Sequence, residues 1–244
     1  MINKMIKKTI TALRLLMFNR KGFFQRIFSG YFGRYDIFLF YSQAKIRSYF
    51  LAPKKRLFVD LGANIGQGYQ FFNPIYPNKH YDYILVEPNH FCVDELKKTL
   101  NHKDGVTVLQ AAAWINNGKK LFYGVAESGN NTTLGASIVK DHKTKTYDSN
   151  NETAVSVNTF DFSEFLFKKK EVYDEIIVKM DVESSEYDIL EKLVNESSIK
   201  CIDRLFVEFH TNWMKESKSK DNYILREKEL INILPKLTNF HIWV

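Results

Sequence analysis

The sequence predicts an α/β fold in which a mostly parallel central sheet carries helices on both faces. The first observation is a short apolar run at residues 57–61, which ends in a glycine-rich loop and is typical of a buried parallel strand. The second is another apolar run, at residues 83–87, which also ends in an acidic residue. The third is the alternation of strand-like and helix-like segments from residue 57 onward, which favours parallel strands joined by helices.

Each further element has its own signal. Before the first strand, apolar residues recur at helical spacing between Ile2 and Met17, and residues 36–51 form a second expected helix that ends before Pro53. Later apolar runs predict strands at 106–110, 176–181, 204–210 and 240–244, with extra strands at 119–125 and 153–158. Helical patterns between these runs predict helices at 66–72, 91–101, 185–194 and 223–234.

Composition places the chain among ordinary globular proteins. It has 244 residues, of which 45% are hydrophobic and 26% charged, enough for one full α/β domain. Its two cysteines, Cys92 and Cys201, match no metal or redox spacing, which is typical of a reducing compartment. Neither an apolar stretch of membrane-spanning length nor a signal peptide is recognisable. We therefore expect a cytoplasmic protein.

Positive charge is concentrated at the N-terminus. The net charge is +7, and eight Lys and Arg residues precede the first acidic residue, Asp36. The sequence thus divides into a basic helical extension, residues 1–53, and a main domain, residues 54–244. Two interpretations of the extension stay open. Either it lies on an anionic membrane surface or acidic partner, or it packs on the domain core or on another subunit of a homo-oligomer.

The glycine-rich loop indicates the charge of its ligand. Asp60, Gly62 and Gly66 stand in the order D-x-G-x-x-x-G, which differs from the dinucleotide fingerprint and from the phosphate-binding loop. The glycines let the backbone turn sharply and approach a ligand closely. An acid beside the loop suits a positively charged ligand such as S-adenosylmethionine better than a pyrophosphate. Glu87 ends the second strand, where doubly wound sheets place an acid for ribose hydroxyls.

Two later strands also end in polar side chains. Lys179 interrupts an otherwise buried strand, and Asp181 lies on the same face, so each can neutralise the other. Glu208 and His210 repeat this arrangement at the end of the next expected strand. Because ligands bind at the carboxyl ends of strands in open α/β sheets, these four residues are candidates for an active site, with a structural ion pair as the alternative for Lys179 and Asp181.

Several segments together resemble one known family. VDLGANIG, VEPN, the Gln-Ala-Ala segment after the third strand, VNTFDFSEF, IIVKMDVESSEYDILEKL and FVEFH are similar to the FkbM family of S-adenosylmethionine-dependent methyltransferases, across residues 57–210. Members usually have Gly-Ala or a similar pair where this chain has Ser184-Ser185, and we expect serine to cap the following helix there. The resemblance implies a class I Rossmann-like methyltransferase fold and O-methylation of a small-molecule or glycan hydroxyl.

The residues and the resemblance agree on a candidate site. The expected cofactor contacts are Asp60, Gly62, Asn64 and Gly66 for the methionine half, Glu87 for the ribose, and Asn89, Gln110 and Ala111 beside the adenine. Methyl transfer requires an aligned acceptor oxygen and removal of its proton. The candidate catalytic residues are Lys179, Asp181, Glu208 and His210. The last three either act as base and orienting groups or hold a divalent metal ion, and the sequence does not choose between these roles.

The acceptor is the least constrained part of the prediction. The polar segment 127–151 has too few apolar residues to pack by itself, so we expect a surface loop, and its Ser, Asn and Thr side chains would suit a sugar-binding lid. The leading hypothesis is a sugar hydroxyl in surface-polysaccharide or glycolipid biosynthesis, with a glycan or small-molecule acceptor. A nucleic-acid methyltransferase is disfavoured because the basic residues concentrate in the extension. A catalytically silent interaction protein is the third hypothesis.

Overall fold

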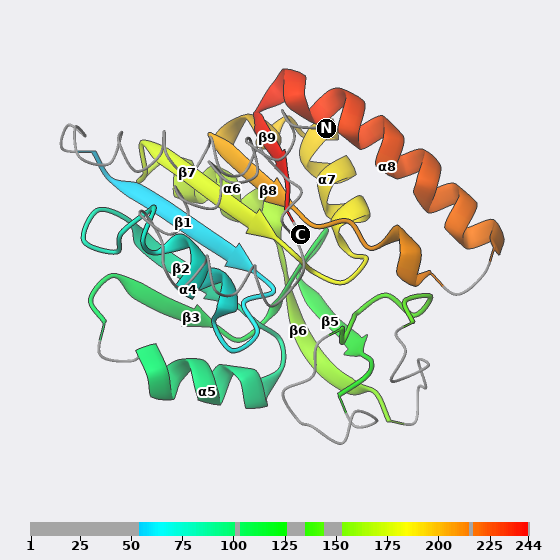
Figure 1. Ribbon diagram of the computed structural model, residues 1–244, viewed down its shortest axis with the longest axis horizontal. Helices are drawn as coiled ribbons and strands as arrows, with labels where there is room; N and C mark the ends of the chain where they lie inside the picture. The colour runs from blue at the N-terminus through cyan, green and yellow to red at the C-terminus, as the bar shows by residue number, and fades with distance from the viewer. Residues whose placement is uncertain (1–53, 101–102, 126–134, 144–152, 215–216, 244) are drawn as a thin grey trace, which may run out of the picture.

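The computed structural model describes residues 54–100, 103–125, 135–143, 153–214 and 217–243, in which strands and helices alternate (Figure 1). The two helices predicted for the N-terminal extension lie outside the described residues, so the boundary predicted between residues 53 and 54 stays a prediction. Among the described residues, no helix is both long and apolar enough to cross a membrane.

A six-stranded sheet forms the centre of the fold. Its strands are β1 (Arg56–Leu61), β2 (Asp82–Val86), β3 (Val106–Leu109), β7 (Glu175–Met180), β8 (Arg204–Val207) and β9 (Asn239–Ile242). They lie in the order β3-β2-β1-β7-β8-β9, and every neighbouring pair is parallel, which confirms the predicted sheet. The strand order reverses at β1, and such a reversal is where open α/β sheets bind ligands.

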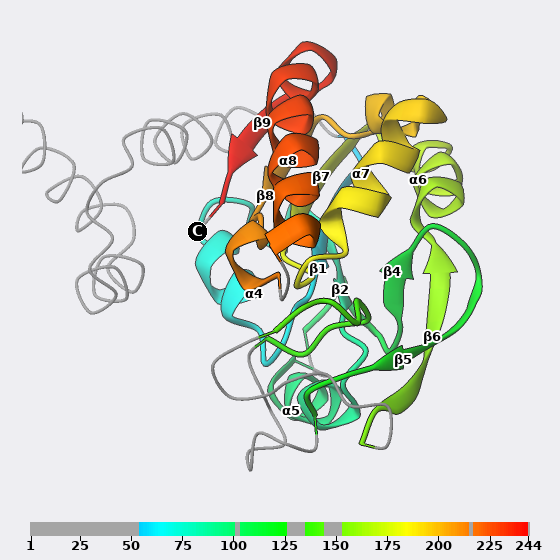
Figure 2. The same ribbon diagram turned by 90° about the vertical axis from the view of Figure 1, so that its right-hand side faces the viewer.

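Helices cover both faces of this sheet (Figure 2). They are α4 (Gln67–Phe72) and α5 (His90–Leu100) on one face, and α6 (Phe162–Lys170), α7 (Glu186–Asn195) and α8 (Ser217–Leu237) on the other. Phe58 of β1 belongs to one apolar core with Phe72 and Leu96, whereas Val59 belongs to a second core with Leu190. Side chains alternate along a strand, so β1 contributes to both cores.

A second, smaller sheet lies beside the first. Its strands are β4 (Ala112–Trp114), β5 (Gly118–Phe122) and β6 (Val155–Asp161), in the order β4-β6-β5, with β4 parallel and β5 antiparallel to β6. The two extra strands that the sequence predicts correspond to β5 and β6. Neither β4 nor α6 is among the predicted elements. The Asp161 carboxylate caps α6 by accepting hydrogen bonds from the N–H groups of Ser163 and Glu164.

Two element ends differ from the prediction in ways that affect the site. Strand β8 ends at Val207 rather than at residue 210, and a short 3-10 helix, η2 (Thr211–Trp213), follows it. A second such helix, η1 (Ser198–Cys201), precedes β8. Ser185 is the N-cap residue of α7, as predicted, but its hydroxyl donates to the Val182 carbonyl at 2.6 Å and makes no capping hydrogen bond.

Part of the polar segment packs inside the domain. Within residues 135–143, Ile138 is 6% exposed and belongs to the main core, and His142 is fully buried. Backbone hydrogen bonds join Ser137 to Tyr123 in both directions, at 2.8 and 3.1 Å. The expectation of a surface loop is therefore wrong for this part, because long-range pairing orders it. The Ser, Asn and Thr residues at 128–133 lie outside the described residues, so the lid stays a hypothesis.

Candidate active site

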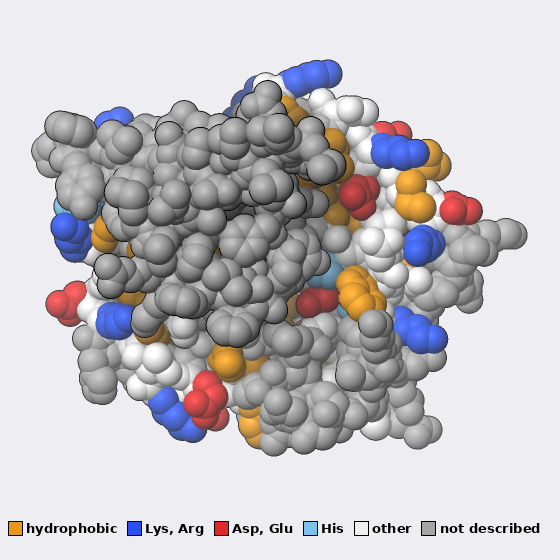
Figure 3. All heavy atoms as spheres, viewed as in Figure 1, with side chains coloured by type: hydrophobic (Ala, Val, Ile, Leu, Met, Phe, Trp, Pro, Cys, Tyr) orange, Lys and Arg blue, Asp and Glu red, His pale blue; other side chains and the backbone are white. Residues whose placement is uncertain are grey.

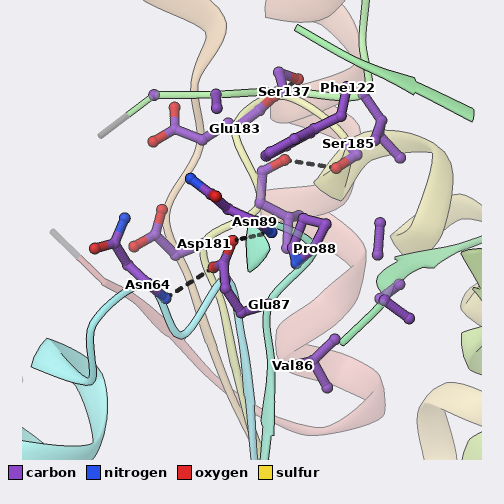
Figure 4. Close-up of a pocket in the computed structure, with 18 residues that line it drawn as sticks. Asn64, Val86, Glu87, Pro88, Asn89, Phe122, Ser137, Asp181, Glu183 and Ser185 are labelled. Atoms are coloured by element: carbon purple, nitrogen blue, oxygen red, sulfur yellow. Dashed lines mark hydrogen bonds between the residues drawn. The ribbon is translucent and has the colours of Figure 1, made fainter. Parts of the chain in front are cut away.

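A cavity with about 650 Å³ of empty space, part of it open to solvent, lies at the carboxyl ends of β1, β2 and β7 (Figure 4). Its polar wall comes from the residues that follow these strands, Gly62 and Asn64 after β1, Glu87 and Asn89 after β2, and Asp181 after β7. Its apolar wall includes Val86, Ala111, Ala112, Ala113, Phe122 and Ile138.

The loop after β1 has a left-handed backbone. Gly62, Asn64 and Gly66 have φ angles of 73°, 45° and 96°. A Cβ atom on Gly62 would lie 1.8 Å from the carbonyl oxygen of Asp181, so this position requires glycine. The N–H groups of Gly62 and Ala63 both donate to the Val86 carbonyl at 3.0 Å. The loop is therefore fixed against both neighbouring strands of the sheet.

Glu87 is held at the cavity wall by two backbone N–H groups. Asn64 donates to one carboxylate oxygen at 2.8 Å, and Asn89 donates to the other at 2.9 Å (Figure 4). Burial raises the pKa of Glu87 from 4.5 to about 7, although these two hydrogen bonds act in the opposite direction. The Glu87 carboxyl therefore titrates near neutral pH, and its charged form can accept hydrogen bonds from a ligand's hydroxyl groups.

Lys179 joins two carboxylates beneath the cavity. Its Nζ lies 3.1 Å from Asp60 Oδ1 and 3.1 Å from Asp181 Oδ2, and it donates to the Gly62 carbonyl at 3.0 Å. Burial raises the pKa of Asp60 to about 6, and Lys179 opposes that shift. Burial alone would lower the pKa of Lys179, but Asp181 and Asp60 raise it above its ordinary value. The predicted pairing of Lys179 with Asp181 is confirmed, and Asp60 is a second partner.

Two histidines approach the carboxylates on the other side of Asp181. His210 Nε2 lies 3.6 Å from Asp181 Oδ1 and 3.3 Å from Glu183 Oε2. His142 Nε2 lies 3.3 Å from the same Glu183 oxygen. Figure 3 shows histidine and acidic side chains next to each other near the middle of one face of the molecule. Asp181, Glu183 and His210 offer ligand atoms that all lie within 4.8 Å of one another, an arrangement that can hold a metal ion.

The neighbouring charges give the two histidines different proton affinities. Burial lowers the pKa of His210, but Glu186, Glu183 and Asp181 outweigh burial and raise it to about 10. Burial lowers the pKa of His142 to about 3, and the charge on His210 adds to that effect. Burial raises the pKa of Glu183 to about 7. At pH 7 the protein by itself thus holds His210 charged and His142 neutral.

Most of the predicted site residues meet at this cavity. Six of them line it directly, namely Gly62, Asn64, Glu87, Asn89, Ala111 and Asp181. Asp60 and Lys179 are buried beneath it as an ion pair, and His210 is buried behind Asp181. The structure therefore gathers residues from five separate strand ends into one place, while their roles toward a cofactor stay predictions.

Three predicted residues lie away from the cavity wall. Gly66 precedes the first turn of α4, and the Gln110 side chain is exposed. Glu208 is partly buried, and burial followed by the charge of Asp181 raises its pKa. Glu208 is not one of the three potential metal ligands, which are Asp181, Glu183 and His210. The alternation that places Glu208 and His210 on one strand face does not apply, because β8 ends at Val207.

Two residues of the site, Glu183 and His142, are missing from the sequence prediction, and a third, Ser137, was expected only as part of the polar segment 127–151. Glu183 stands in the K-x-D-V-E segment two residues after Asp181, so the motif itself was the available signal. Ser137 lines the cavity and donates a hydrogen bond to the Glu183 carbonyl. His142 has no local signal, because its burial depends on a backbone bridge to Met214, far along the chain.

Comparison with known proteins identifies the family. Residues 60–237 match the methyltransferase FkbM domain. No curated protein matches the chain. The chain is 16% identical to a solved methyltransferase FkbM from Methylobacillus flagellatus KT, with a TM-score of 0.41 and coverage of 81% of this chain and 42% of that one. It is 12% identical to the yeast methylglyoxal/isovaleraldehyde reductase Gre2 complexed with NADPH, with a TM-score of 0.34 and coverage of 77% and 52%.

The chain thus spans about half the length of these two solved structures, and at such TM-scores neither likeness bears on the site. The domain match is different, because it extends from Asp60 in β1 to Leu237 at the end of α8 and includes every strand end that contributes to the cavity. On this match, the chain belongs to the FkbM methyltransferase family.

Proposed function

We propose that this protein transfers a methyl group from S-adenosylmethionine to a hydroxyl oxygen of a sugar or a related small molecule. Family membership gives methyl transfer. The observation that carries the finer proposal is the Glu87 carboxylate, held by two backbone N–H groups in the wall of a cavity at the point where the strand order reverses. A carboxylate in that position suits the two hydroxyls of a ribose.

The other residues of the cavity fit the same cofactor. The apolar wall, which includes Ala111 and Phe122, suits an adenine ring. When bound, S-adenosylmethionine supplies an electrophilic methyl group. The protein's own residues must then orient the acceptor oxygen and assist the removal of its proton.

The acceptor side of the site is built from carboxylates and amides. Asp181 and Glu183 have side chains that are 26% and 23% exposed, so both are accessible from the cavity. Asn64, Asn89 and Ser137 add polar groups to the same wall. Carboxylate, amide and hydroxyl groups together recognise polyols by hydrogen bonding. These groups support a sugar hydroxyl as the acceptor, in the assembly of a surface polysaccharide or glycolipid.

Calorimetric titration tests the cofactor. S-adenosylmethionine and its demethylated product should bind, and NAD should not, because the loop lacks the glycine order of dinucleotide sites. Asp181→Asn and His210→Ala should lose turnover but keep the affinity for the cofactor. Binding of NAD alone would refute the proposal.

Transfer of a labelled methyl group tests the acceptor. Purified protein with labelled S-adenosylmethionine is incubated with glycan, lipid, protein and RNA fractions of the source cell. We expect label in the glycan or glycolipid fraction. Label in RNA or protein alone would show that the acceptor is not a sugar. Cofactor binding without labelling of any fraction would favour an interaction protein that keeps the fold.

A further inference from the structure

We propose that Asp181, Glu183 and His210 bind one divalent first-row transition-metal ion at the inner edge of the cavity, and that His142 moves toward Glu183 to become the fourth ligand. The proposed site is not a purely acidic cluster, because two imidazole nitrogens lie close to its carboxylates. Its role in catalysis rests on the proposed function, whereas metal binding itself can be measured independently.

The distances between the potential ligand atoms suit one cation. Glu183 Oε2 lies 3.3 Å from His142 Nε2 and 3.3 Å from His210 Nε2, and His210 Nε2 lies 3.6 Å from Asp181 Oδ1. Ligands bound at about 2.1 Å from a metal lie about 3.0 Å apart in octahedral geometry and about 3.4 Å apart in tetrahedral geometry. Asp181, Glu183 and His210 therefore need little movement to share a cation, whereas His142, which is close to Glu183 but outside that group of three, has to move toward the ion.

Both histidine rings are held from behind by their Nδ1 atoms. His210 Nδ1 lies 3.2 Å from Glu186 Oε1, and the same oxygen accepts the His210 backbone N–H at 2.9 Å. His142 Nδ1 lies 2.8 Å from Ser184 Oγ. Metal-binding histidines generally use the second ring nitrogen in this way, because a carboxylate or other acceptor there fixes the ring and directs Nε2 toward the metal. Glu186 is fully buried, so the support for His210 is rigid.

The backbone just after Asp181 has a strained conformation next to the proposed metal site. Glu183 and Ser184 have φ angles of 51° and 77°, which are uncommon for residues other than glycine. Ser137 holds this turn by donating to the Glu183 carbonyl. The strained turn presents the Glu183 carboxylate and the Ser184 hydroxyl to His142 from consecutive positions. Such strain is kept where the surrounding structure fixes it, and it is concentrated at functional sites.

A divalent cation also balances the charges of this region. Lys179 already pairs with Asp60 as well as with one oxygen of Asp181. A cation held by Asp181 Oδ1 and Glu183 would neutralise those two carboxylates and would take the place of the proton on His210, which leaves when the metal binds. Two imidazoles with two carboxylates favour Mn²⁺, Fe²⁺ or Zn²⁺ over Mg²⁺ and Ca²⁺, which prefer oxygen ligands.

The cation would be accessible from the acceptor side. Asp181 and Glu183 line the cavity, while His210 and His142 are buried behind them. An acceptor hydroxyl that binds the ion has a lowered pKa and releases its proton to water. Its oxygen then forms the new C–O bond while the C–S bond breaks and its electron pair passes to sulfur, so no further reactant is needed.

Metal titration of the chelator-treated, full-length protein tests the proposal. Binding of Mn²⁺ is followed by loss of the free-ion electron paramagnetic resonance signal, and Zn²⁺ by competition. One site is expected. His142→Ala and Glu183→Gln should each weaken binding by at least about tenfold, and Glu186→Gln by about 10–100-fold. The control variants His80→Ala and Glu229→Gln, whose side chains are exposed, should bind like the unaltered protein.

The same titrations separate the two proposals. Each variant is also titrated with S-adenosylhomocysteine, which checks that it is folded. If the product binds but neither metal does, or if His142→Ala and Glu183→Gln leave metal affinity unchanged, the metal site is refuted and the proposed function stands. If metal binds as expected but the product does not, the metal site stands and the proposed function fails.

Discussion

Lys179 is the residue on which the buried charges of the site depend. It contacts Asp60, which is fully buried, and Asp181, which faces the cavity. A buried carboxylate that loses its partner is far more destabilising than a complete pair is stabilising. The site therefore tolerates Asp60 inside the protein because the ammonium group lies 3.1 Å away.

Lys179→Met should destabilise the protein by about 3–5 kcal/mol at pH 8, because it leaves Asp60 buried without a counter-charge. The loss should shrink as the pH falls, because protonation neutralises Asp60, whose pKa is already raised to about 6. Urea unfolding at pH 8 and pH 5 measures both effects. Adding Asp60→Asn to the variant should restore part of the stability. Equal stability of Lys179→Met and the unaltered protein would contradict the pairing.

Glu87 should make the affinity for the cofactor product depend on pH. Its pKa is raised to about 7, so the protein below pH 7 must release a proton before the carboxylate can accept from ribose hydroxyls. Affinity for S-adenosylhomocysteine should therefore increase, by up to about tenfold per pH unit, as the pH rises toward 7, and then level off. Calorimetry at several pH values measures the slope. In Glu87→Gln this slope should disappear, and a slope that persists would assign it to another group.

Single residues of the site were predictable where a strand carried them. The acids and the lysine at the ends of β1, β2 and β7 interrupt apolar runs, so Asp60, Glu87, Lys179 and Asp181 stand out in the sequence. Sequence reasoning could not show that Asp60 pairs with Lys179 instead of facing the cavity, because that depends on the register between β1 and β7. His142 was not predictable, since no regular element carries it.

At the scale of elements, the turn between β1 and α4 is the most constrained. Gly62 has a φ angle of 73° and lies against the Asp181 carbonyl, where a Cβ would approach to 1.8 Å. Gly105 offers a matched comparison, since its φ angle is 75° but its nearest contact would be a side-chain oxygen of Asp82 at 3.1 Å. The two glycines thus share the same backbone strain and differ in the space around them.

Gly105→Ala should destabilise the protein by about 1–2 kcal/mol, mainly through backbone strain, because the Asp82 side chain 3.1 Å from the new Cβ needs only a small shift. Gly62→Ala should destabilise it more and should also lower the affinity for S-adenosylhomocysteine, because the overlap with Asp181 has to displace the loop. Thermal unfolding and calorimetric titration of both variants measure these effects. Similar unfolding temperatures with unchanged affinity would show that the loop can move away from β7.

Helices and strands with a clear apolar pattern over several residues were predictable from the sequence, and those without such a pattern were not. Strands β1, β2, β7 and β8 of the main sheet are largely buried apolar runs, and β3 and β9 at its edges are partly exposed, but all six were located. Strand β4 has three residues, Ala112–Trp114, too few to show any period. Helix α6 was not predicted, because Phe162, Phe165 and Phe167 leave its sequence without a clear polar face. The burial of residues 135–143 depends on pairing with Tyr123, just after β5, and on the contact with Met214, and such long-range pairing leaves no local pattern.

For the whole molecule, the distribution of charge sets the two parts of the chain apart. Residues 1–53 contain 10 of the 35 Lys and Arg residues and one of the 28 Asp and Glu residues. Residues 54–244 therefore contain 25 basic and 27 acidic residues, a net charge of −2, against +9 for the extension. The positive charge of this protein belongs to its N-terminal extension and not to its methyltransferase domain.

If the extension contacts a membrane, the full chain should sediment with vesicles that contain anionic lipids and not with neutral vesicles. Neutralising Lys4, Lys7 and Lys8 to Gln should weaken this binding, and raising the salt concentration should weaken it further. Cosedimentation measures both. If the chain does not bind anionic vesicles, the alternative is that the extension packs on the domain or on a second copy of the chain. Analytical ultracentrifugation of the full chain then distinguishes a monomer from a homo-oligomer.

Because Gly62 has no side chain, its turn lies directly against the backbone of Asp181, and Lys179 ties the Gly62 carbonyl to the Asp181 carboxylate. A ligand that orders the loop therefore also orders the carboxylate that would hold the cation. Such coupling is reciprocal, so Mn²⁺ should tighten S-adenosylhomocysteine binding by the same factor by which S-adenosylhomocysteine tightens Mn²⁺ binding. Titrating each in the presence of the other measures this cooperativity. The protein would then populate mainly its empty and doubly loaded states, and an acceptor would rarely meet a half-assembled site.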